Sequence, residues 1–174
     1  RAGLIDHASY LKLLTKAVQQ VLQTPGRAVQ TVAQASFDAW IRYYRPDAHT
    51  PNSTVSYYTK GALVALCLDL SLRREGRTTL DDVLRTLWQR SAGGPMDEAV
   101  LREVLQDLGG RSFDAELDAW VHSTAELPLA ELLQAHGMAL QSDAPQPAQR
   151  LGLRVTEGSA VLVKTVLRGG LAEQ

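Results

Sequence analysis

A long apolar helix in the middle of the sequence constrains the fold more than any other feature. Its apolar run covers residues 63–68, and the polar segment that leads into it carries Tyr57 and Tyr58. Ser56 is suited to cap this helix, and Gly76, with arginines in the turn before it, is suited to end it. A helix with so apolar a stretch has to be buried. We therefore expect a helical protein packed around this segment.

Composition indicates a globular chain with one sizeable core. The chain has 174 residues, a formal net charge of −1 and 45% hydrophobic residues. Charges of both signs are interspersed, so neither a nucleic-acid-binding face nor a membrane-binding surface is expected. No stretch approaches the roughly 18 uninterrupted apolar residues of a membrane span. The one cysteine, Cys67, cannot form an internal disulfide and is expected to be a small buried hydrophobic residue.

Caps and terminators divide the first 141 residues into helices with short connections. Asp6 is expected to cap the first helix, which ends at the turn 24–27. Thr79 and Asp82 have the spacing of a capping box at the start of another helix. In chain order, the later helices are expected near 36–43, 56–76, 79–92, 96–108, 112–121 and 128–136. This pattern predicts a mainly α antiparallel helical array.

The character of the sequence changes near residue 145. Residues 142–150 form a polar, proline-bearing linker, and the β-rich segments 151–155 and 160–166 follow with a turn between them. Two strands cannot form an independent domain, so residues 151–174 are expected to be the beginning of a second domain. Because the chain opens at Arg1 without a methionine, we expect it to be a piece of a longer polypeptide. Its compartment, cytoplasmic or periplasmic, stays open.

The histidines do not form a metal-binding pair. His7, His49, His122 and His136 never fall at the i, i+4 spacing that puts two imidazoles on one helix face. There is no Cys-x-x-Cys motif, and the glycine pairs at 93–94 and 109–110 are better explained as helix terminators than as phosphate loops. No metal site is expected within this chain, and His49 and His136 are expected to be solvated.

Several charged residues have a simple structural interpretation. Asp114, Glu116 and Asp118 lie in the first turns of an expected helix, where compensation of the helix dipole and solvation explain them better than acid–base chemistry. Arg27 and Arg45 could bind a substrate carboxylate, but solvated arginines are the simpler interpretation.

The aromatic residues are the best candidates for chemistry. A cluster at helical spacing is expected to pack in the core, or alternatively to line a substrate cleft: Phe37, Trp40, Tyr43 and Tyr44. Tyr57 and Tyr58 stand at a helix start, where a fixed phenol could donate a hydrogen bond to a developing oxyanion. They could equally be packing residues. Gly61 is expected to allow close approach of another part of the chain.

Tyr58-Thr59-Lys60-Gly61 resembles the Tyr-Glu-Lys-Gly segment of zinc aminopeptidases with a thermolysin-like catalytic domain. The wider string from Arg27 to Gly61 resembles the bacterial glycyl aminopeptidase family, whose members carry a PDZ domain after the catalytic region. Residues 113–121 and 126–129 fit its downstream helices, and 151–155 with 166–170 are similar to the opening of its PDZ domain.

The resemblance implies a zinc-dependent aminopeptidase that removes small N-terminal residues, glycine above all, from peptides. Residues 1–141 would be the C-terminal helical lobe of its catalytic domain. The zinc ligands, a His-Glu-x-x-His pair and a glutamate, would precede Arg1, so zinc is expected in the full-length parent and neither zinc nor activity in this chain.

The same resemblance assigns one catalytic residue. Tyr58 would donate to the tetrahedral oxyanion. Because Thr59 stands where the broader group has glutamate, a register slip of one residue would give this role to Tyr57. A complete PDZ domain would bind peptide tails. The alternative is a non-enzymatic helical protein-interaction module; a helix-turn-helix nucleic-acid binder fits the charge balance poorly.

Overall fold

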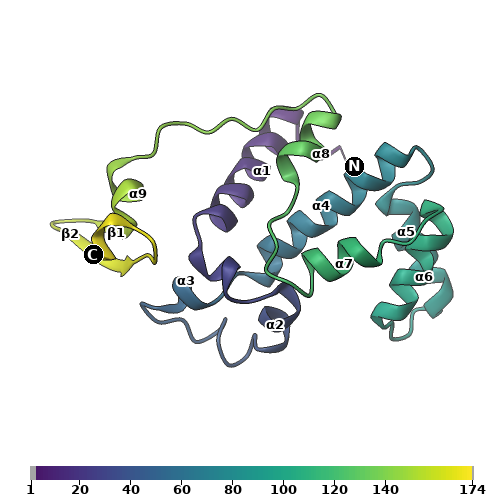
Figure 1. Cartoon of the computed structure of the whole chain (residues 1–174), viewed down its shortest axis with the longest axis horizontal. Helices are drawn as coiled ribbons and strands as arrows, with labels where there is room; N and C mark the ends of the chain where they lie inside the picture. Colours follow the sequence, from purple (N-terminus) through teal and green to yellow (C-terminus); the bar gives the residue numbers. More distant parts are fainter. Residues whose placement is uncertain (1–2, 174) are drawn as a thin grey trace. The chain divides into compact units, whose positions relative to one another are not determined.

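The computed structural model describes residues 3–173 and divides the chain into two compact units (Figure 1). The first unit contains the described residues up to Leu63, residues 122–124, and the chain from Ser142 onward. The second unit contains residues 64–121 and 125–141. Both units are rich in helix, and a two-stranded antiparallel sheet lies near the C-terminus. The predicted fold class, mainly α with a short β-rich C-terminal segment, is confirmed.

The first unit begins with helices that have clear capping residues. Its elements are α1 (His7–Leu22), the 3-10 helix η1 (Pro25–Ala28), α2 (Val32–Phe37), α3 (Thr50–Ser53) and the first turns of α4 (Tyr57–Glu75). Asp6 Oδ1 accepts from the Ser9 amide at 2.6 Å, which confirms the predicted cap of α1. Ser56 Oγ accepts from the Thr59 amide at 3.2 Å, the contact that an N-cap side chain makes at the start of α4.

The helix expected near 36–43 begins earlier than predicted. Thr31 and Gln34 form a capping box, with Thr31 Oγ1 and Gln34 Oε1 each accepting a backbone N–H at 3.1 Å. This cap starts α2 at Val32, and residues 38–44 form turns instead of helix. The predicted start at residue 36 is wrong because the Thr31 cap, which sets the start of the helix, lies earlier in the sequence.

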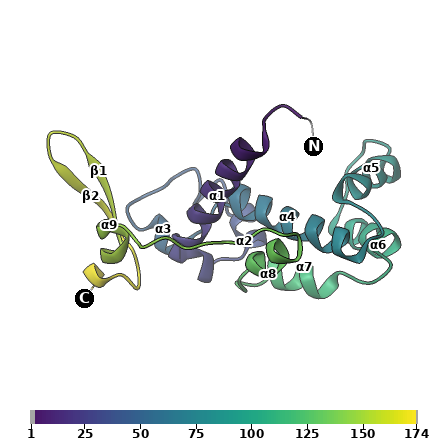
Figure 2. The same cartoon turned by 90° about the horizontal axis from the view of Figure 1, so that it is seen from above.

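The C-terminal part of the first unit is a hairpin with a short helix beside it. Its elements are α9 (Pro147–Leu151), β1 (Leu153–Glu157), β2 (Val161–Val166) and the 3-10 helix η2 (Leu171–Glu173). β1 pairs antiparallel with β2, from Leu153 opposite Val166 to Glu157 opposite Val161. Figures 1 and 2 both show α9 next to the hairpin. Helix α9 was not expected, and Pro147 in its first turn together with Gly152 at its end (φ 72°) explains it.

The second unit continues α4 and adds α5 (Leu80–Ser91), α6 (Glu98–Gly109), α7 (Asp114–Trp120) and α8 (Leu129–Ala135). The Thr79–Asp82 capping box is present at the start of α5, as predicted. Gly110, in the left-handed conformation at φ 74°, ends α6. Gly109 serves packing as well, since a Cβ there would lie 2.5 Å from Phe113 Cε2.

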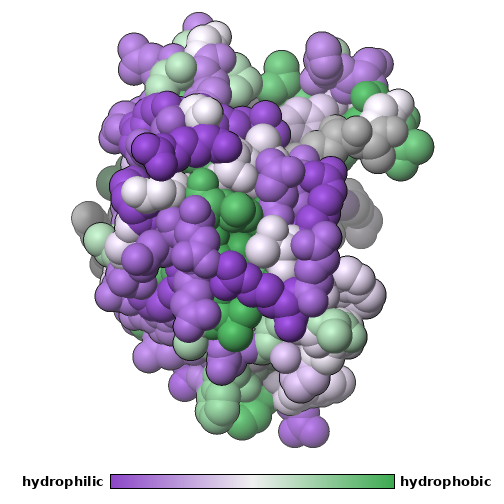
Figure 3. All heavy atoms as spheres, turned by 90° about the vertical axis from the view of Figure 1, so that its right-hand side faces the viewer, coloured by the Kyte–Doolittle hydropathy of each residue, from purple (hydrophilic) through white to green (hydrophobic). Residues whose placement is uncertain are grey.

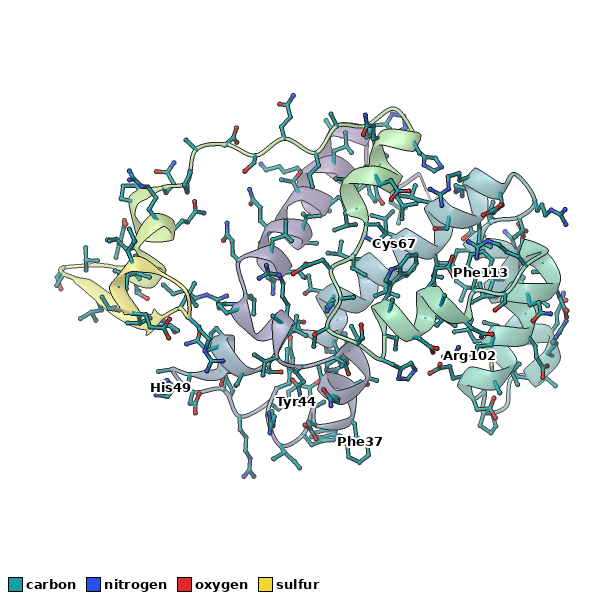
Figure 4. The ribbon with its side chains drawn as sticks, in the orientation of Figure 1. Phe37, Tyr44, His49, Cys67, Arg102 and Phe113 are labelled. Atoms are coloured by element: carbon teal, nitrogen blue, oxygen red, sulfur yellow. The ribbon has the colours of Figure 1, made fainter. Side chains whose placement is uncertain are left out.

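The apolar residues of α4 form the centre of the core, as predicted. Cys67 is fully buried, and its burial raises the pKa of its thiol to about 12. Phe113 and Leu72 are also almost completely buried (Figure 4 labels Cys67 and Phe113). Within residues 3–173, no helix combines the length and apolarity that crossing a membrane requires.

Some apolar side chains of the second unit reach its surface. Figure 3 looks onto the face that carries α5 and α6 and shows hydrophobic residues among hydrophilic ones. Leu84 and Trp88, one helical turn apart on α5, are among the exposed large hydrophobic residues. Scattered exposed apolar residues of this kind are common on folded proteins.

Two glycines provide a matched test of the packing. A Cβ on Gly26 would lie 2.1 Å from the Thr54 carbonyl oxygen, whereas nothing among the described residues lies within 4 Å of a Cβ on Gly61. The close approach expected at Gly61 is therefore wrong for this chain. In urea unfolding, we expect Gly26→Ala to destabilise by roughly 1–3 kcal/mol through overpacking and Gly61→Ala to stabilise the helix by up to about 1 kcal/mol. Equal effects of the two substitutions would contradict this packing.

Candidate functional site

Four tyrosines from two segments meet at the start of α4. Tyr43 and Tyr44 lie in the turns after α2, and Tyr57 and Tyr58 are the first residues of α4. The ring centroids of Tyr57 and Tyr58 are 4.2 Å apart, and Tyr43 lies edge-on to Tyr57 at 5.4 Å and to Tyr58 at 5.9 Å. These separations are close to those of favourable aromatic pairs. We call these four residues the tyrosine cluster.

The cluster is held by buried backbone on the N-terminal side of α4. Thr54 and Val55 are both buried, and the Thr54 hydroxyl donates to Gln30 Oε1. Gly26 lets the backbone of η1 approach Thr54 closely. Ser56, which caps α4, also donates from its hydroxyl to the Tyr43 oxygen at 3.3 Å. The start of α4 is therefore tied both to η1 and to the segment that carries Tyr43.

Tyr44 connects the hydroxyls of the two helix-start tyrosines. Its oxygen lies 3.1 Å from that of Tyr58 and 3.3 Å from that of Tyr57. The hydrogen bond with Tyr44 is the main cause of two opposite shifts: it raises the pKa of Tyr57 and lowers the pKa of Tyr58. A phenol that donates is stabilised in its neutral form, and one that accepts is stabilised as the anion.

The opposite shifts fit a row of three hydroxyl groups in which each hydroxyl donates a hydrogen bond to the next. The signs of the two shifts agree with donation from Tyr57 to Tyr44 and from Tyr44 to Tyr58, while the distances allow either oxygen of each pair to donate. The proton of Tyr58 then remains available for an acceptor outside the cluster. Tyr58 is 58% exposed, so such an acceptor can reach it.

The other aromatic residues of this region lie at the surface. Phe37 and Trp40 are 89% and 81% exposed, so the expectation that they pack in the core is wrong (Figure 4 labels Phe37). Because α2 begins at Val32, the buried positions of this segment are Ala35 and Ala39 instead. Trp40 contacts the ring of Tyr44, with centroids 5.2 Å apart, and so extends the tyrosine cluster outward.

A pocket of about 350 Å³ lies beside the cluster. Its wall includes Tyr43 of the cluster, the capping residue Ser56, and Thr59 of the first turn of α4. Thr24 and Arg154 lie on its wall as well, with Arg154 Nη2 donating to Thr24 Oγ1 at 2.9 Å. Sequence reasoning missed this pocket, because Arg154 comes from β1, far along the chain from the tyrosines.

The remaining candidates have structural roles or stay apart from the cluster. Arg27 donates to the Thr24 carbonyl at 3.3 Å, while Arg45 and His49 are exposed. The His136 ring nitrogen Nδ1 lies 2.8 Å from the Leu132 carbonyl at the end of α8, so His136 is not simply solvated. Among residues 3–173, no group of three histidine, cysteine, aspartate or glutamate side chains could hold a metal ion.

The acidic residues of α7 form ion pairs. Arg102 of α6 (Figure 4) donates to Asp114 at 2.8 Å and to Asp118 at 2.7 Å, and its hydrogen bond lowers the pKa of Asp114. Glu116 pairs with Arg111 at 2.5 Å. The interpretation as dipole compensation and solvation is therefore incomplete, because these carboxylates also join α7 to its neighbours. Ion-paired carboxylates of this kind are poor candidates for acid–base chemistry.

Comparisons with known proteins point to one family. The M61 glycyl aminopeptidase family matches residues 1–64. A solved structure described as an aminopeptidase N family protein from Idiomarina loihiensis is similar over 96% of this chain, with 32% identity and a TM-score of 0.86. The chain covers only 32% of that structure. No curated protein matches the chain. The two matches confirm the resemblance to the glycyl aminopeptidases.

The hydroxyl chain can be tested by titrating the tyrosines. If Tyr44 donates to Tyr58, Tyr44→Phe should raise the pKa of Tyr58, and less tyrosinate should form in the early part of the titration. We expect the tyrosinate absorbance curve of Tyr44→Phe to lose its earliest component, and Tyr58→Phe to lose the same component. Tyr10→Phe, which alters an exposed tyrosine of α1, should retain it. Retention of the early component in both Tyr44→Phe and Tyr58→Phe would contradict the chain.

Proposed function

We propose that this chain, which resembles the M61 glycyl aminopeptidases, is part of an aminopeptidase catalytic domain and contributes its oxyanion-stabilising hydroxyl. One observation supports this most: Tyr58, the tyrosine of the family segment, has an exposed hydroxyl at the start of a buried helix. In the parent protein, the reaction would remove a small N-terminal residue, by resemblance glycine, from a peptide.

The proposed role follows from the charge that peptide hydrolysis creates. Attack on the scissile carbonyl forms a tetrahedral intermediate whose oxygen carries negative charge. A preorganised O–H donor stabilises that charge without having to reorient during the reaction. We infer that Tyr58 meets this need: its hydroxyl lies 3.1 Å from that of Tyr44, and when it accepts from Tyr44 its own proton stays available. A phenol that accepts a hydrogen bond is also a stronger donor, because hydrogen bonds in a chain polarise one another.

The same hydroxyl chain favours Tyr58 over Tyr57. In this arrangement the Tyr57 proton is engaged with Tyr44, and the raised pKa of Tyr57 agrees with a donor that holds its proton. Tyr57 is also less exposed than Tyr58. A register in which Tyr57 serves the oxyanion would require this hydrogen bond to be broken first.

In this proposal, zinc would be bound by the parent protein and not by this chain alone. The resemblance implies a zinc-dependent enzyme, but the described part of the chain contains no cluster of ligands that fits the metal. The ligands would therefore come from another part of the parent. The complete PDZ domain of such a parent would bind peptide tails, and residues 151–174 would contribute only part of that site.

Substituting Tyr58 tests the catalytic proposal. In the parent aminopeptidase, Tyr58→Phe keeps the ring and removes the donor, so kcat should fall about 10²–10³-fold while KM changes little. Tyr10→Phe is the matched control and should retain wild-type turnover. Steady-state kinetics on a peptide with an N-terminal glycine provides the measurement. Near wild-type turnover in Tyr58→Phe would reject the assignment, and a loss confined to Tyr57→Phe would transfer the role to Tyr57.

Metal content tests the placement of the zinc site. After incubation with zinc and dialysis, the untagged 174-residue chain should retain far less than one zinc per molecule, because its described residues provide no ligand cluster. It should also leave a glycine-terminated peptide uncleaved. Elemental analysis and an amine-release assay give the two readouts, and one tightly held zinc per chain would overturn this placement.

A non-enzymatic interaction module remains the second candidate. The exposed aromatic residues Phe37 and Trp40, with Ile41 beside them, are the observation that favours it, because exposed apolar clusters often mark protein contacts. In this alternative the tyrosines only pack. Loss of partner binding in Trp40→Ala, together with full turnover in Tyr58→Phe, would favour the module over the peptidase.

A further inference from the structure

A second pocket of the first unit has a wall rich in arginine. It has a volume of about 330 Å³ and lies between the end of α1 with η1 and the C-terminal hairpin with α9. Four arginines line it: Arg27 of η1, Arg150 of α9, Arg154 of β1 and Arg168 after β2. No aspartate or glutamate is among its lining residues. This is unusual for a chain with 18 lysines and arginines and 19 aspartates and glutamates.

Three of these arginines have no ion pair. Among the residues that the structure describes, no carboxylate pairs with Arg150, Arg154 or Arg168. By contrast, Arg102 and Arg111 of the second unit each contact two or more carboxylates. Within the described residues, the positive charges of Arg150, Arg154 and Arg168 are therefore left without a carboxylate partner.

Arg154 is the arginine for which a counterion matters most. Its one side-chain hydrogen bond goes to the neutral hydroxyl of Thr24, at 2.9 Å. The residue as a whole is exposed, but partial removal of its guanidinium from water lowers the pKa of Arg154. Desolvation disfavours a charged group, and a bound anion would offset that cost.

The pocket is built in place by contacts on both of its sides. The Asn52 side chain donates to the Val166 carbonyl at 2.8 Å and accepts from the Arg168 amide at 2.8 Å. Gly152 and Gly170 touch closely, since a Cβ on either would lie 2.6 Å from the Cα of the other. Glu173 accepts from the Gly169 amide at 2.6 Å and does not line the pocket. A ligand would therefore meet backbone that is already ordered, which lowers the cost of binding.

We propose that this pocket binds a small, multiply charged oxyanion of the phosphate type. A guanidinium presents a planar fork of N–H donors that matches two oxygens, so one arginine can satisfy a single carboxylate. Four arginines around one small pocket match a ligand with several charged oxygens instead. This pocket shares Arg154 with the pocket beside the tyrosine cluster, but none of the four tyrosines lines it, and its assignment does not depend on the peptidase function.

Calorimetric titration of the 174-residue chain with inorganic pyrophosphate tests the site. We expect saturable binding at one site that weakens as salt is added, because the attraction is electrostatic. Arg150→Gln and Arg168→Gln should each weaken binding about tenfold, the effect expected for losing a charge-assisted hydrogen bond. Neither side chain has a partner to lose among residues 3–173, so both variants should fold. Arg85→Gln, which alters an exposed arginine of α5, is the matched control and should bind normally.

Comparing the affinities of several anions distinguishes the possible outcomes. Tighter binding of ADP than of pyrophosphate would support the site and identify its ligand as a phosphorylated nucleoside, and the reverse order would support it as a site for the free ion. Binding no tighter than that of acetate would overturn the proposal. Equal affinity in Arg168→Gln and in the wild type would also overturn it, as would preference for an acidic peptide over both phosphate probes.

Discussion

Burial of α4 is the constraint on which the rest of the structure depends. Leu63, Cys67 and Leu72 of this helix are almost completely buried. Because removing large apolar residues from water supplies most of the driving force for folding, the position of this helix in the core is strongly determined. Ser56 caps its first turn, so the residues that follow the cap stand at a defined place and angle. Tyr57 and Tyr58 therefore take part of their fixed geometry from the burial of the helix that carries them.

The tyrosine cluster shows how half-exposed side chains can be held in well-defined positions. Its hydroxyls lie near the surface, where a single hydrogen bond contributes little to stability. Their positions come instead from the packing of the rings against one another and from Ser56, which contacts both the Tyr43 hydroxyl and the start of α4. The opposite pKa shifts of Tyr57 and Tyr58 have the same main cause, the hydrogen bond of each with their shared partner Tyr44, and the interaction of Tyr57 with Tyr58 adds to both shifts. Two tyrosines at neighbouring positions thereby have pKa values that are shifted in opposite directions.

Arginines serve opposite purposes in the two units. In the second unit Arg102 is surrounded by carboxylates from α6 and α7, and its charge is neutralised within the protein. In the first unit Arg150 and Arg168 line a pocket that has no acidic wall. The net charge of −1 does not show this difference between paired and unpaired arginines, because it is a sum over the whole chain. Composition alone had indicated only a surface of mixed charge.

The sequence by itself determined the features that depend on neighbouring residues. The caps at Asp6, Ser56 and Thr79, the burial of Cys67 and the hairpin near the C-terminus could all be predicted, because each is encoded within a few positions. The start of α2 is also encoded locally, by the Thr31 cap, but the prediction did not include that cap and placed the helix too late in the sequence.

Only the tertiary structure decided which distant side chains meet. The contact of Tyr44 with Tyr58, the pairing of Arg102 with Asp114 and Asp118, and the gathering of arginines around one pocket join residues on separate elements. Hydrophobic periodicity cannot predict these contacts. It shows which face of a helix or strand is buried, but it does not show which other element packs against that face. The candidate tyrosine could therefore be identified from the sequence, whereas the hydroxyl that orients it could not.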